Sequence, residues 1–554
     1  MAGVIAIGKQ DFATLIEGNY FYIDKTALIR EWWESGDSVT LITRPRRFGK
    51  TLNMDMLNCF FSNRYAGRQD LFAPFEIWQD PHYRTLQGTY PVLFLSFADV
   101  KADHIEEAKQ QIKSAIAYLY EENRFLLDAD ILSENEKNYY HNITMYMGDV
   151  EAAGAIRSLC LYLKRYYGKK TILLLDEYDT PMQEAYVHGY WDAFVSFIQM
   201  LFNSTFKTNP YMERAMLTGI TRVSKESIFS DLNNPNVVTA TSEEYATAFG
   251  FTEPEVFEQL ERFGLGEHKA QVKKWYDGFV FGSHRDIYNP WSITNYLDKK
   301  KLRPYWAATS SNALINELIQ RASADIKEKM ECLLQQQEII VNFDEQIVFN
   351  QLDKNENAIW SLLLASGYLK AEQVEYRGEL FQPWYHLCIT NLETKSMFLT
   401  MFRDWFASAG AAYQGLIRAL MGHDLEALNY YMNKTTTTVF SFFDVADKEP
   451  EKFYHGFVLG LLADQMDQYE IRSNRESGFG RYDIMMIPRQ NVKPAVVIEF
   501  KVKNKEKTLE ETVQSALQQI TAKNYDAEIL DRGIDPERIY HYGFAFEGKE
   551  VLIG

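Results

Sequence analysis

The chain has 554 residues, more than one hydrophobic core usually holds, so its length predicts several domains. Its composition, 46% hydrophobic and 14% aromatic, excludes an intrinsically disordered protein. A formal net charge of -18 excludes a protein that coats nucleic acid indiscriminately, because phosphate contacts require local Lys and Arg. Any nucleic-acid site must therefore be a local basic segment.

Cysteine spacing and hydropathy exclude two further classes. The cysteines stand far apart in the chain, which argues against a disulfide framework and against a CxxC zinc site: Cys59, Cys160, Cys332 and Cys388. The first residues lack a basic leader, and no apolar stretch reaches the roughly 18 residues of a membrane span. We expect a cytoplasmic protein without a membrane partner.

Residues 1–245 alternate short apolar runs with helical patterns. This order predicts a mostly parallel sheet covered by helices on both faces, the α/β class. The predicted strands are residues 39–42, 92–97, 172–175, 215–217 and 237–240. Helical patterns at 105–120 and 155–167 are long enough for right-handed crossovers between parallel strands.

A candidate phosphate-binding loop follows the first predicted strand. The strand SVTLIT leads into RPRRFGKT and then into a helical pattern, as phosphate binding at a helix N-terminus requires. Lys50 is expected at the β and γ phosphates and Thr51 at Mg²⁺. The predicted nucleotide-binding residues are Arg44, Pro45, Arg46, Arg47, Phe48, Gly49, Lys50 and Thr51.

The loop departs from the usual GxxxxGK[ST] pattern, because Arg44 occupies the first glycine position. The turn must form without that glycine's freedom in φ, so we expect Pro45 and a turn that carries side chains to replace it.

A second acidic motif supports nucleotide binding. The apolar strand at 171–175 ends in Asp176 and Glu177, of which the first is expected to hold Mg²⁺ and the second to polarise the attacking water. Thr218 could sense the γ-phosphate, and Arg222 could act as an arginine finger. Ordinary strand-end charges and hydroxyls are the alternative interpretation of these residues.

These motifs resemble the AAA-ATPase-like domain found in many bacterial proteins. The resemblance rests on four segments: YIDKT at 22–26, TRPRRFGKTLN at 43–53, LLLDEYDTP at 173–181 and LTGITRVSKESIFSDLNN at 217–234. An arginine-rich loop without the first glycine is typical of this family. Asp24 and Lys25 lie in the first segment, where a structural salt bridge is favoured over a nucleotide contact.

Residues 246–420 are mainly helical in pattern and contain no catalytic constellation. The run at 360–364 followed by SGYLK suggests a helix leading into a strand, as in a winged-helix lid. The threonines at 435–438 suggest a linker or turn before the last domain. After it we expect a helix at 451–462, strands at 482–487 and 495–500, and a helix at 509–523.

The last domain carries a candidate metal-dependent nuclease site. Such nucleases need two carboxylates converging on a metal and a lysine beside the water. Asp483 opens one strand, the chain reverses at PRQNVK, and Glu499 and Lys501 follow at a spacing of two, on one face of the next strand. The solvent-exposed face of an edge strand is the alternative interpretation.

Weaker candidates surround this site. Glu451 and His455 share a helix face, and a structural role is favoured for them. Gln519 and Lys523 share a face of the final helix and could reach a phosphate backbone, whereas Tyr525 is expected to point elsewhere. The phosphate contacts are expected from the basic segment 471–510, which holds nine Lys or Arg against five Asp or Glu, Arg475 and Arg481 among them.

This region resembles the PD-(D/E)XK nuclease superfamily, in the branch usually fused to the ATPase-like domain. The matching segments are FYHG at 453–456, SNRES at 473–477, GRYD at 480–483 and VIEFK at 497–501. The proline of the superfamily name is replaced by Tyr482, as in many members. The resemblance implies an α/β restriction-endonuclease-like fold.

The sequence therefore predicts a P-loop AAA-ATPase-like domain at 1–245, a helical lid region at 246–420 and a nuclease-like domain at 421–554. We expect ATP and Mg²⁺ as cofactors, with Thr51, Asp176, Asp483 and Glu499 as metal ligands and Mn²⁺ as an alternative at the nuclease site. The expected substrate is nucleic acid, with DNA favoured over RNA, and cleavage is expected to be controlled by the ATPase. Two alternatives stay open: a nucleotide-switched binding module with an inactive nuclease fold, and an ATPase that remodels a protein partner. An oligomer is required if Arg222 acts in trans.

Overall fold

The computed structural model forms two compact units, each assembled from two stretches of the chain. One unit comprises Met1–Ser311 and Ile340–Thr394, and the other comprises Asn312–Ile339 and Lys395–Gly554. The structure describes residues 3–554 except 208, 222–234, 308–312, 335, 346–351, 353–354, 408–409, 440–461, 463–464, 466–467, 478–479, 491, 505 and 548–549. The division into three domains at residues 245 and 420 stays a prediction.

The first unit is built on a five-stranded sheet with the order β2-β3-β4-β1-β5, in which all four pairings are parallel. The five strands are β1 (Val39–Thr43), β2 (Val92–Ser96), β3 (Thr171–Asp176), β4 (Met212–Gly219) and β5 (Asn236–Val238). Each contains or overlaps one of the predicted strands, so the predicted α/β fold is confirmed. Both faces are covered, and β1 and β3 are buried along their whole length, which explains why their sequences are apolar without alternation.

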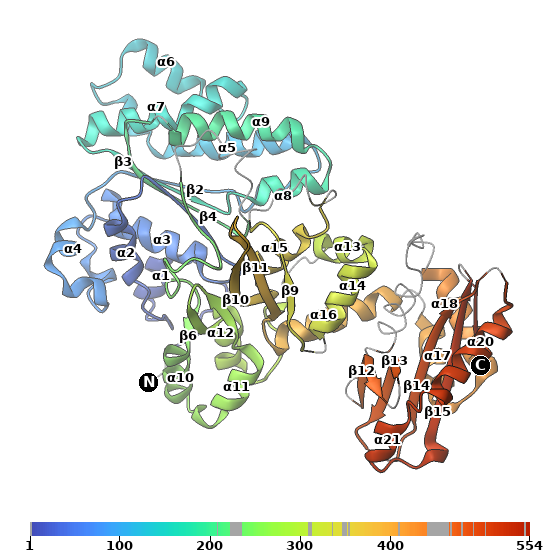
Figure 1. The fold of residues 1–554 in the computed structure, drawn as a ribbon. Coiled ribbons are helices and arrows are strands. Elements are labelled where there is room, and N and C mark those ends of the chain that lie inside the picture. Colours follow the sequence, from blue (N-terminus) through green and yellow to red (C-terminus); the bar gives the residue numbers. More distant parts are fainter. Residues whose placement is uncertain are drawn as a thin grey trace. The chain divides into compact units, whose positions relative to one another are not determined.

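Helices flank this sheet on both faces (Figure 1). One face carries α5 (Ile105–Glu122), α7 (Asp149–Tyr167) and α9 (Trp191–Phe202), of which the first two correspond to the predicted crossovers. The other face carries α3 (Lys50–Phe61), which shares a hydrophobic core with residues of β1, β3 and β4. The remaining helices of this part are α1 (Phe12–Glu17), α2 (Ala27–Ser35), α4 (Pro81–Leu86), α6 (Glu134–Asn142) and α8 (Thr180–Val187).

The middle of the chain is mainly helical, as predicted, but it also contains two small sheets. Its helices are α10 (Glu253–Arg262), α11 (Lys269–Tyr276), α12 (Pro290–Lys299), α13 (Ala313–Arg321), α14 (Ala324–Leu334), α15 (Ala358–Ala365) and α16 (Leu392–Ala407). One sheet has the order β6-β8-β7, from β6 (Phe251–Thr252), β7 (Phe279–Phe281) and β8 (His284–Tyr288). The other has the order β10-β11-β9, from β9 (Ile339–Val341), β10 (Leu369–Arg377) and β11 (Gln382–Ile389). The predicted helix leading into a strand is present as α15 and β10.

The second unit contains a mixed sheet with the order β12-β13-β14-β15-β16. Its strands are β12 (Tyr469–Ser477), β13 (Gly480–Pro488), β14 (Ala495–Val502), β15 (Ile539–Glu547) and β16 (Glu550–Ile553). β14 and β15 are parallel and joined through α20 (Leu509–Ala522) and α21 (Ala527–Asp531), while the other pairings are antiparallel. The predicted strands at 482–487 and 495–500 and the helix at 509–523 are therefore present.

Two helices pack on this sheet, α17 (Gly410–Gly422) and α18 (Leu425–Val439). The predicted linker or turn at residues 435–438 is wrong, because these threonines lie within α18. Threonine lowers helix propensity only modestly, and the buried Leu428 and Met432 anchor the helix on the sheet. The predicted helix at 451–462 lies, apart from Leu462, outside the described residues.

Candidate functional site

The predicted phosphate loop connects β1 to α3, with Gly49 as the N-cap of the helix and Lys50 as its first residue. Two residues of the loop have a left-handed backbone, Gly49 at φ 81° and Arg47 at φ 64°. The first is accessible to glycine at no cost, whereas a non-glycine residue in this conformation carries strain. The loop is therefore held by its surroundings.

The Arg44 side chain supplies part of that support. It is fully buried, and its guanidinium donates to the carbonyl oxygens of Thr43 and Thr239 at 2.9 and 2.8 Å, and of Glu244 and Tyr245 at 3.4 and 3.5 Å. It also stacks on Phe281, 4.3 Å from the ring centroid. Burial lowers the pKa of Arg44 to about 9. We expected a nucleotide contact from Arg44, but its guanidinium is engaged by backbone carbonyls and fixes the start of the loop.

Aromatic side chains from the middle of the chain fix the other end of the loop. Phe48 is buried and packs edge-on against Phe279 and Phe281 of β7, with ring centroids 4.7 and 5.5 Å apart. Arg47, exposed beside it, places its guanidinium 4.6 Å from the ring centroid of Trp291 in α12. The loop thus packs against elements that follow it by more than 200 residues.

Lys50 is buried at the start of α3, with its ammonium turned toward the loop. Its Nζ donates to the carbonyl oxygens of Arg44 and Pro45, both at 3.1 Å, and lies 3.6 Å from Oε1 of Glu177. Glu177 follows β3 in a left-handed conformation at φ 52°. The structure therefore brings Lys50, predicted to bind phosphate, next to Glu177, the carboxylate predicted to polarise the attacking water.

Asp176 connects three elements at one edge of the sheet. Its Oδ2 accepts a hydrogen bond from the Thr51 hydroxyl at 2.6 Å, and its Oδ1 accepts one from the Thr218 hydroxyl at 2.5 Å. β4 lies between β1 and β3, so Thr218 comes from the strand between the loop strand and the Asp176 strand. Burial raises the pKa of Asp176, the Glu177 carboxylate raises it further, and the two hydroxyls oppose the shift.

Sequence reasoning missed Asp179, which is fully buried three residues after Asp176. Its Oδ2 accepts from the backbone N–H groups of Ile220 and Thr221 at 3.0 and 2.8 Å, and from the Thr221 hydroxyl at 2.8 Å. Burial raises the pKa of Asp179, and the Glu177 carboxylate adds to that shift. The signal was present as the second aspartate of LLLDEYDTP. Arg222, the predicted arginine finger, lies outside the described residues.

The YIDKT segment is structural. Asp24 accepts from the backbone N–H of Thr26 and Glu76, both at 2.8 Å. Lys25 is buried and donates to the carbonyl oxygen of Thr247 at 2.9 Å and to both carboxylate oxygens of Glu255 at 2.8 Å. The structural salt bridge favoured for Lys25 is therefore present.

In the second unit, β13 and β14 bring the predicted nuclease residues together. These strands are antiparallel with Ile484 opposite Ile498, and the backbone N–H of Phe500 donates to Oδ2 of Asp483 at 2.7 Å. Glu499 is buried, 3% exposed, and Lys501 lies on the same strand two residues on. The alternative interpretation, in which these residues form the exposed face of an edge strand, is wrong for Glu499. Its carboxylate is buried, and β14 is a central strand of the sheet.

Gln519 of α20 bridges two of these residues. Its side-chain Nε2 donates to Oε1 of Glu499, and its Oε1 accepts from Nζ of Lys501 at 2.8 Å. Nε2 also lies 3.2 Å from the hydroxyl of Tyr525. The expectation that Tyr525 points elsewhere is wrong. Burial raises the pKa of Tyr525, and the charges of Glu499 and Asp483 add to that shift.

Part of the predicted basic segment is already neutralised within the unit. Arg472 pairs with Glu470 and Glu528, and Lys503 pairs with Glu547 at 2.5 Å. The side chains of Arg475 and Arg481 lie outside the described residues, as do Glu451 and His455. A phosphate-binding role for the segment stays a prediction.

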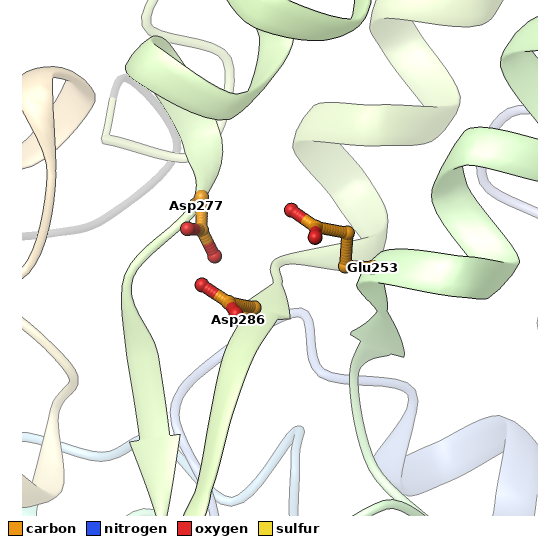
Figure 2. A group of neighbouring side chains, drawn as sticks. All are labelled: Glu253, Asp277 and Asp286. Atoms are coloured by element: carbon orange, nitrogen blue, oxygen red, sulfur yellow. The ribbon is translucent and has the colours of Figure 1, made fainter.

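A separate acidic cluster lies beside the β7–β8 hairpin. Carboxylate oxygens of Glu253, Asp277 and Asp286 lie within 4.8 Å of one another (Figure 2). The ammonium of Lys273 lies 2.5 Å from Glu253, 3.3 Å from Asp286 and 3.9 Å from Asp277. The lysine offsets part of the negative charge and ties α10, α11 and β8 together.

The sheet, the loop after β1 and the acid pair at the end of β3 define the P-loop class of fold. Residues 6–229 match the AAA-ATPase-like family, described as predicted AAA-ATPase, and residues 449–554 match the PD-(D/E)XK nuclease superfamily. The chain therefore joins an AAA-ATPase-like domain to a C-terminal PD-(D/E)XK nuclease superfamily domain, which confirms both resemblances. A relative named "uncharacterized protein in vnfD 5′ region", from Azotobacter chroococcum mcd 1, is 25% identical over 568 residues that cover 99% of this chain and 98% of that protein. Among the described residues no helix is long and apolar enough to cross a membrane.

Proposed function

We propose that the first unit binds and hydrolyses ATP at the loop of residues 44–51, and that the second cleaves nucleic acid at Asp483, Glu499 and Lys501. The observation that carries the first part is the convergence of Lys50 and Thr51, at the start of α3, with Asp176 and Glu177, at the end of β3. A lysine at a helix N-terminus beside two carboxylates matches the charge of a nucleotide phosphate group with its Mg²⁺.

The side chains have separate roles in this proposal. The ammonium of Lys50 contacts the β and γ phosphates, and the Glu177 carboxylate orients and polarises the attacking water. Thr218 contacts the γ-phosphate, and Arg222 is kept as the arginine finger. Burial of Asp176 supports its proposed role as a Mg²⁺ ligand, because a desolvated carboxylate that accepts hydrogen bonds from two neutral hydroxyls is stabilised by a cation.

The oxygen donors at both sites fit a hard divalent cation. The Thr51 hydroxyl and the Asp176 carboxylate are oxygen ligands of the kind Mg²⁺ takes beside substrate phosphates, and Asp483 and Glu499 offer the same chemistry in the second unit. When bound there, Mg²⁺ or Mn²⁺ polarises a phosphate oxygen and lowers the pKa of a bound water. Lys501, hydrogen-bonded to Gln519, supplies a positive charge at the same proposed site.

The proposed substrate is DNA or RNA, with DNA favoured, and the segment 471–510 supplies the phosphate contacts. We assign ATP turnover to residues 1–245 and cleavage to residues 421–554. Control of cleavage by the ATPase is supported by the presence of both sites in one polypeptide. Residues 246–420 carry that control, since β7 and α12 contact the phosphate loop.

The test uses the full chain with Mg²⁺ or Mn²⁺ and labelled single- and double-stranded DNA and RNA, with and without ATP. Lys50→Ala should abolish binding of a fluorescent ATP analogue and change the nucleotide dependence of cleavage. Asp483→Ala should abolish cleavage and leave ATP binding unchanged. Cleavage that persists in Asp483→Ala would rule out the assigned site, and no cleavage under any condition would favour a nucleotide-switched binding module.

A further inference from the structure

The end of β4 is held by an acid that the proposed ATPase mechanism does not use. Four donors converge on Oδ2 of Asp179: the three from Ile220 and Thr221, and the side-chain amide of Gln183 at 3.1 Å. Its Oδ1 accepts no hydrogen bond from any residue that the structure describes. An acid that is fully buried and bonded to the backbone fixes the direction of that backbone.

The neighbouring Tyr178 adds two hydrogen bonds to residues 218–221, which include the end of β4. Its backbone N–H donates to the carbonyl oxygen of Thr218 at 3.0 Å, and its hydroxyl donates to the carbonyl oxygen of Thr221 at 2.8 Å. The carbonyl oxygen of Gly219 accepts from the backbone N–H of Arg44 at 3.1 Å. Residues 218–221 are thus held by hydrogen bonds to the turn after β3 and to Arg44, the first residue of the phosphate loop.

Gly219 permits this close approach. A Cβ atom at Gly219 would lie 2.5 Å from Oδ1 of Asp179 and 2.7 Å from the ring of Tyr178, so any side chain there would displace the turn. Glycine is therefore required at residue 219 because Asp179 and Tyr178 pack directly against its backbone. The left-handed region plays no part, since Gly219 does not have a positive φ.

We propose that Asp179 is a positioning residue of the nucleotide site, which holds the end of β4 so that the Thr218 hydroxyl stays on Asp176 and can discriminate ATP from ADP. The inference rests on the proposed ATP-binding function and deepens it. Thr218 lies two residues before Ile220, the first residue that Asp179 holds, and its hydroxyl lies 2.5 Å from Oδ1 of Asp176. A rotation of the strand end would remove that hydroxyl from the γ-phosphate position and leave the loop contacts of ADP intact.

The experiment measures the affinity of the full chain for fluorescent ATP and ADP analogues with Mg²⁺. Asp179→Ala should reduce the preference for ATP over ADP by about tenfold, the effect of about one lost hydrogen bond to a charged group, with ADP affinity unchanged. Asp179→Asn should restore most of the preference, because it keeps an acceptor oxygen for the backbone. Gly219→Ala should behave like Asp179→Ala, which keeps the inference testable if one variant does not fold.

Two comparisons separate positioning from general damage. Gln183→Ala removes a donor to Asp179 that is not on β4, and it should leave the preference unchanged. In a Thr218→Val background, Asp179→Ala should have almost no further effect, because both changes act on the same hydroxyl. Equal losses of ATP and ADP affinity, or additive effects with Thr218→Val, would overturn the inference alone. Absence of ATP binding by the unmodified chain would overturn the proposed function, and this inference with it.

Discussion

The hydroxyl of Thr51 lies 2.6 Å from Oδ2 of Asp176, although 125 positions separate the two residues in the chain. This contact places the first turn of α3 against the end of β3, with Thr218 of β4 on the other carboxylate oxygen. The carboxylate thereby links the phosphate loop to two strands of the sheet.

Replacing Asp176 by Asn should separate stability from activity. The carboxylate is buried, and burial together with the neighbouring Glu177 carboxylate raises its pKa, so folding destabilises its charged form relative to the unfolded chain. The variant with the neutral amide should therefore unfold at an equal or higher temperature without nucleotide, while ATP hydrolysis falls by about a hundredfold or more, since the proposed Mg²⁺ ligand is lost. Thermal unfolding and phosphate release are the measurements.

Asp103→Asn serves as the control for Asp176→Asn, because the Asp103 side chain is 87% exposed. It should change neither quantity. Asp176→Asn with full hydrolytic activity would remove Asp176 from the metal site.

Restoring the consensus glycine at residue 44 should destabilise the protein. Arg44→Gly removes a buried guanidinium and leaves the carbonyl oxygens of Thr43 and Thr239 without that donor. We expect a loss of about 3 kcal/mol or more in the free energy of unfolding, measured by urea titration. A variant of unchanged stability that has lost ATP binding would instead assign the guanidinium to the nucleotide.

The stability of the first unit should depend on pH through Asp277. Burial and the neighbouring Asp286 carboxyl raise the pKa of Asp277 to about 7, whereas an unfolded aspartate titrates near 4. Between about pH 4 and pH 7 the folded state therefore binds more protons than the unfolded state, and this carboxyl makes stability fall as pH rises. Lys273, Glu253 and Asp286 face it in the same cluster.

The measurement for Asp277 is the unfolding temperature from pH 4.5 to 7.5. Asp277→Asn should match the unmodified chain at the acidic end and exceed it at the neutral end. Glu267→Gln, at a side chain 86% exposed, is the control and should follow the unmodified chain. Glu393, whose pKa is also raised to about 7, contributes equally to all three proteins. Parallel curves for Asp277→Asn and the unmodified chain would contradict the assignment.

Gln519 should be required for metal-dependent cleavage at the proposed nuclease site. Gln519→Met keeps the length of the side chain but removes its bonds to Glu499 and Lys501. Because such bonds orient metal ligands, we expect the Mg²⁺ concentration for half-maximal cleavage to rise about tenfold. Gln518→Met, exposed on the same helix, is the matched control. Equal metal titrations for the two variants would sink this role for Gln519.

The sequence predicted the parallel strands of the first unit and two of the five strands of the mixed sheet, β13 and β14, because buried strands have continuous apolar sequences. It did not predict β6 or β7, which have two and three residues and leave no periodicity to detect. Tyr525 was misplaced because the spacing argument extended α20 past its end. The helix ends at Ala522, and Asn524 takes a left-handed backbone at φ 53°, so the chain turns back toward Gln519.

Asp179 was missed for a different reason. Its partners are backbone N–H groups 41 and 42 residues away, and no sequence pattern marks a backbone group as a partner. Arg44 illustrates the same limit, since its guanidinium is used on carbonyl oxygens about 195 to 201 residues further on. Both residues were visible in motifs, but their contacts depend on the tertiary fold.

The outer edge of the second unit's sheet has its backbone bonds occupied by two side chains. Asn429 of α18 exchanges hydrogen bonds with the N–H and C=O of Ile553 in β16, and Asn433 does the same with Val551. An unpaired edge strand is a template for association with another chain. These amides occupy the backbone groups that a neighbouring strand would use. Replacing both Asn429 and Asn433 by leucine should therefore leave the edge of β16 unpaired and make the protein aggregate.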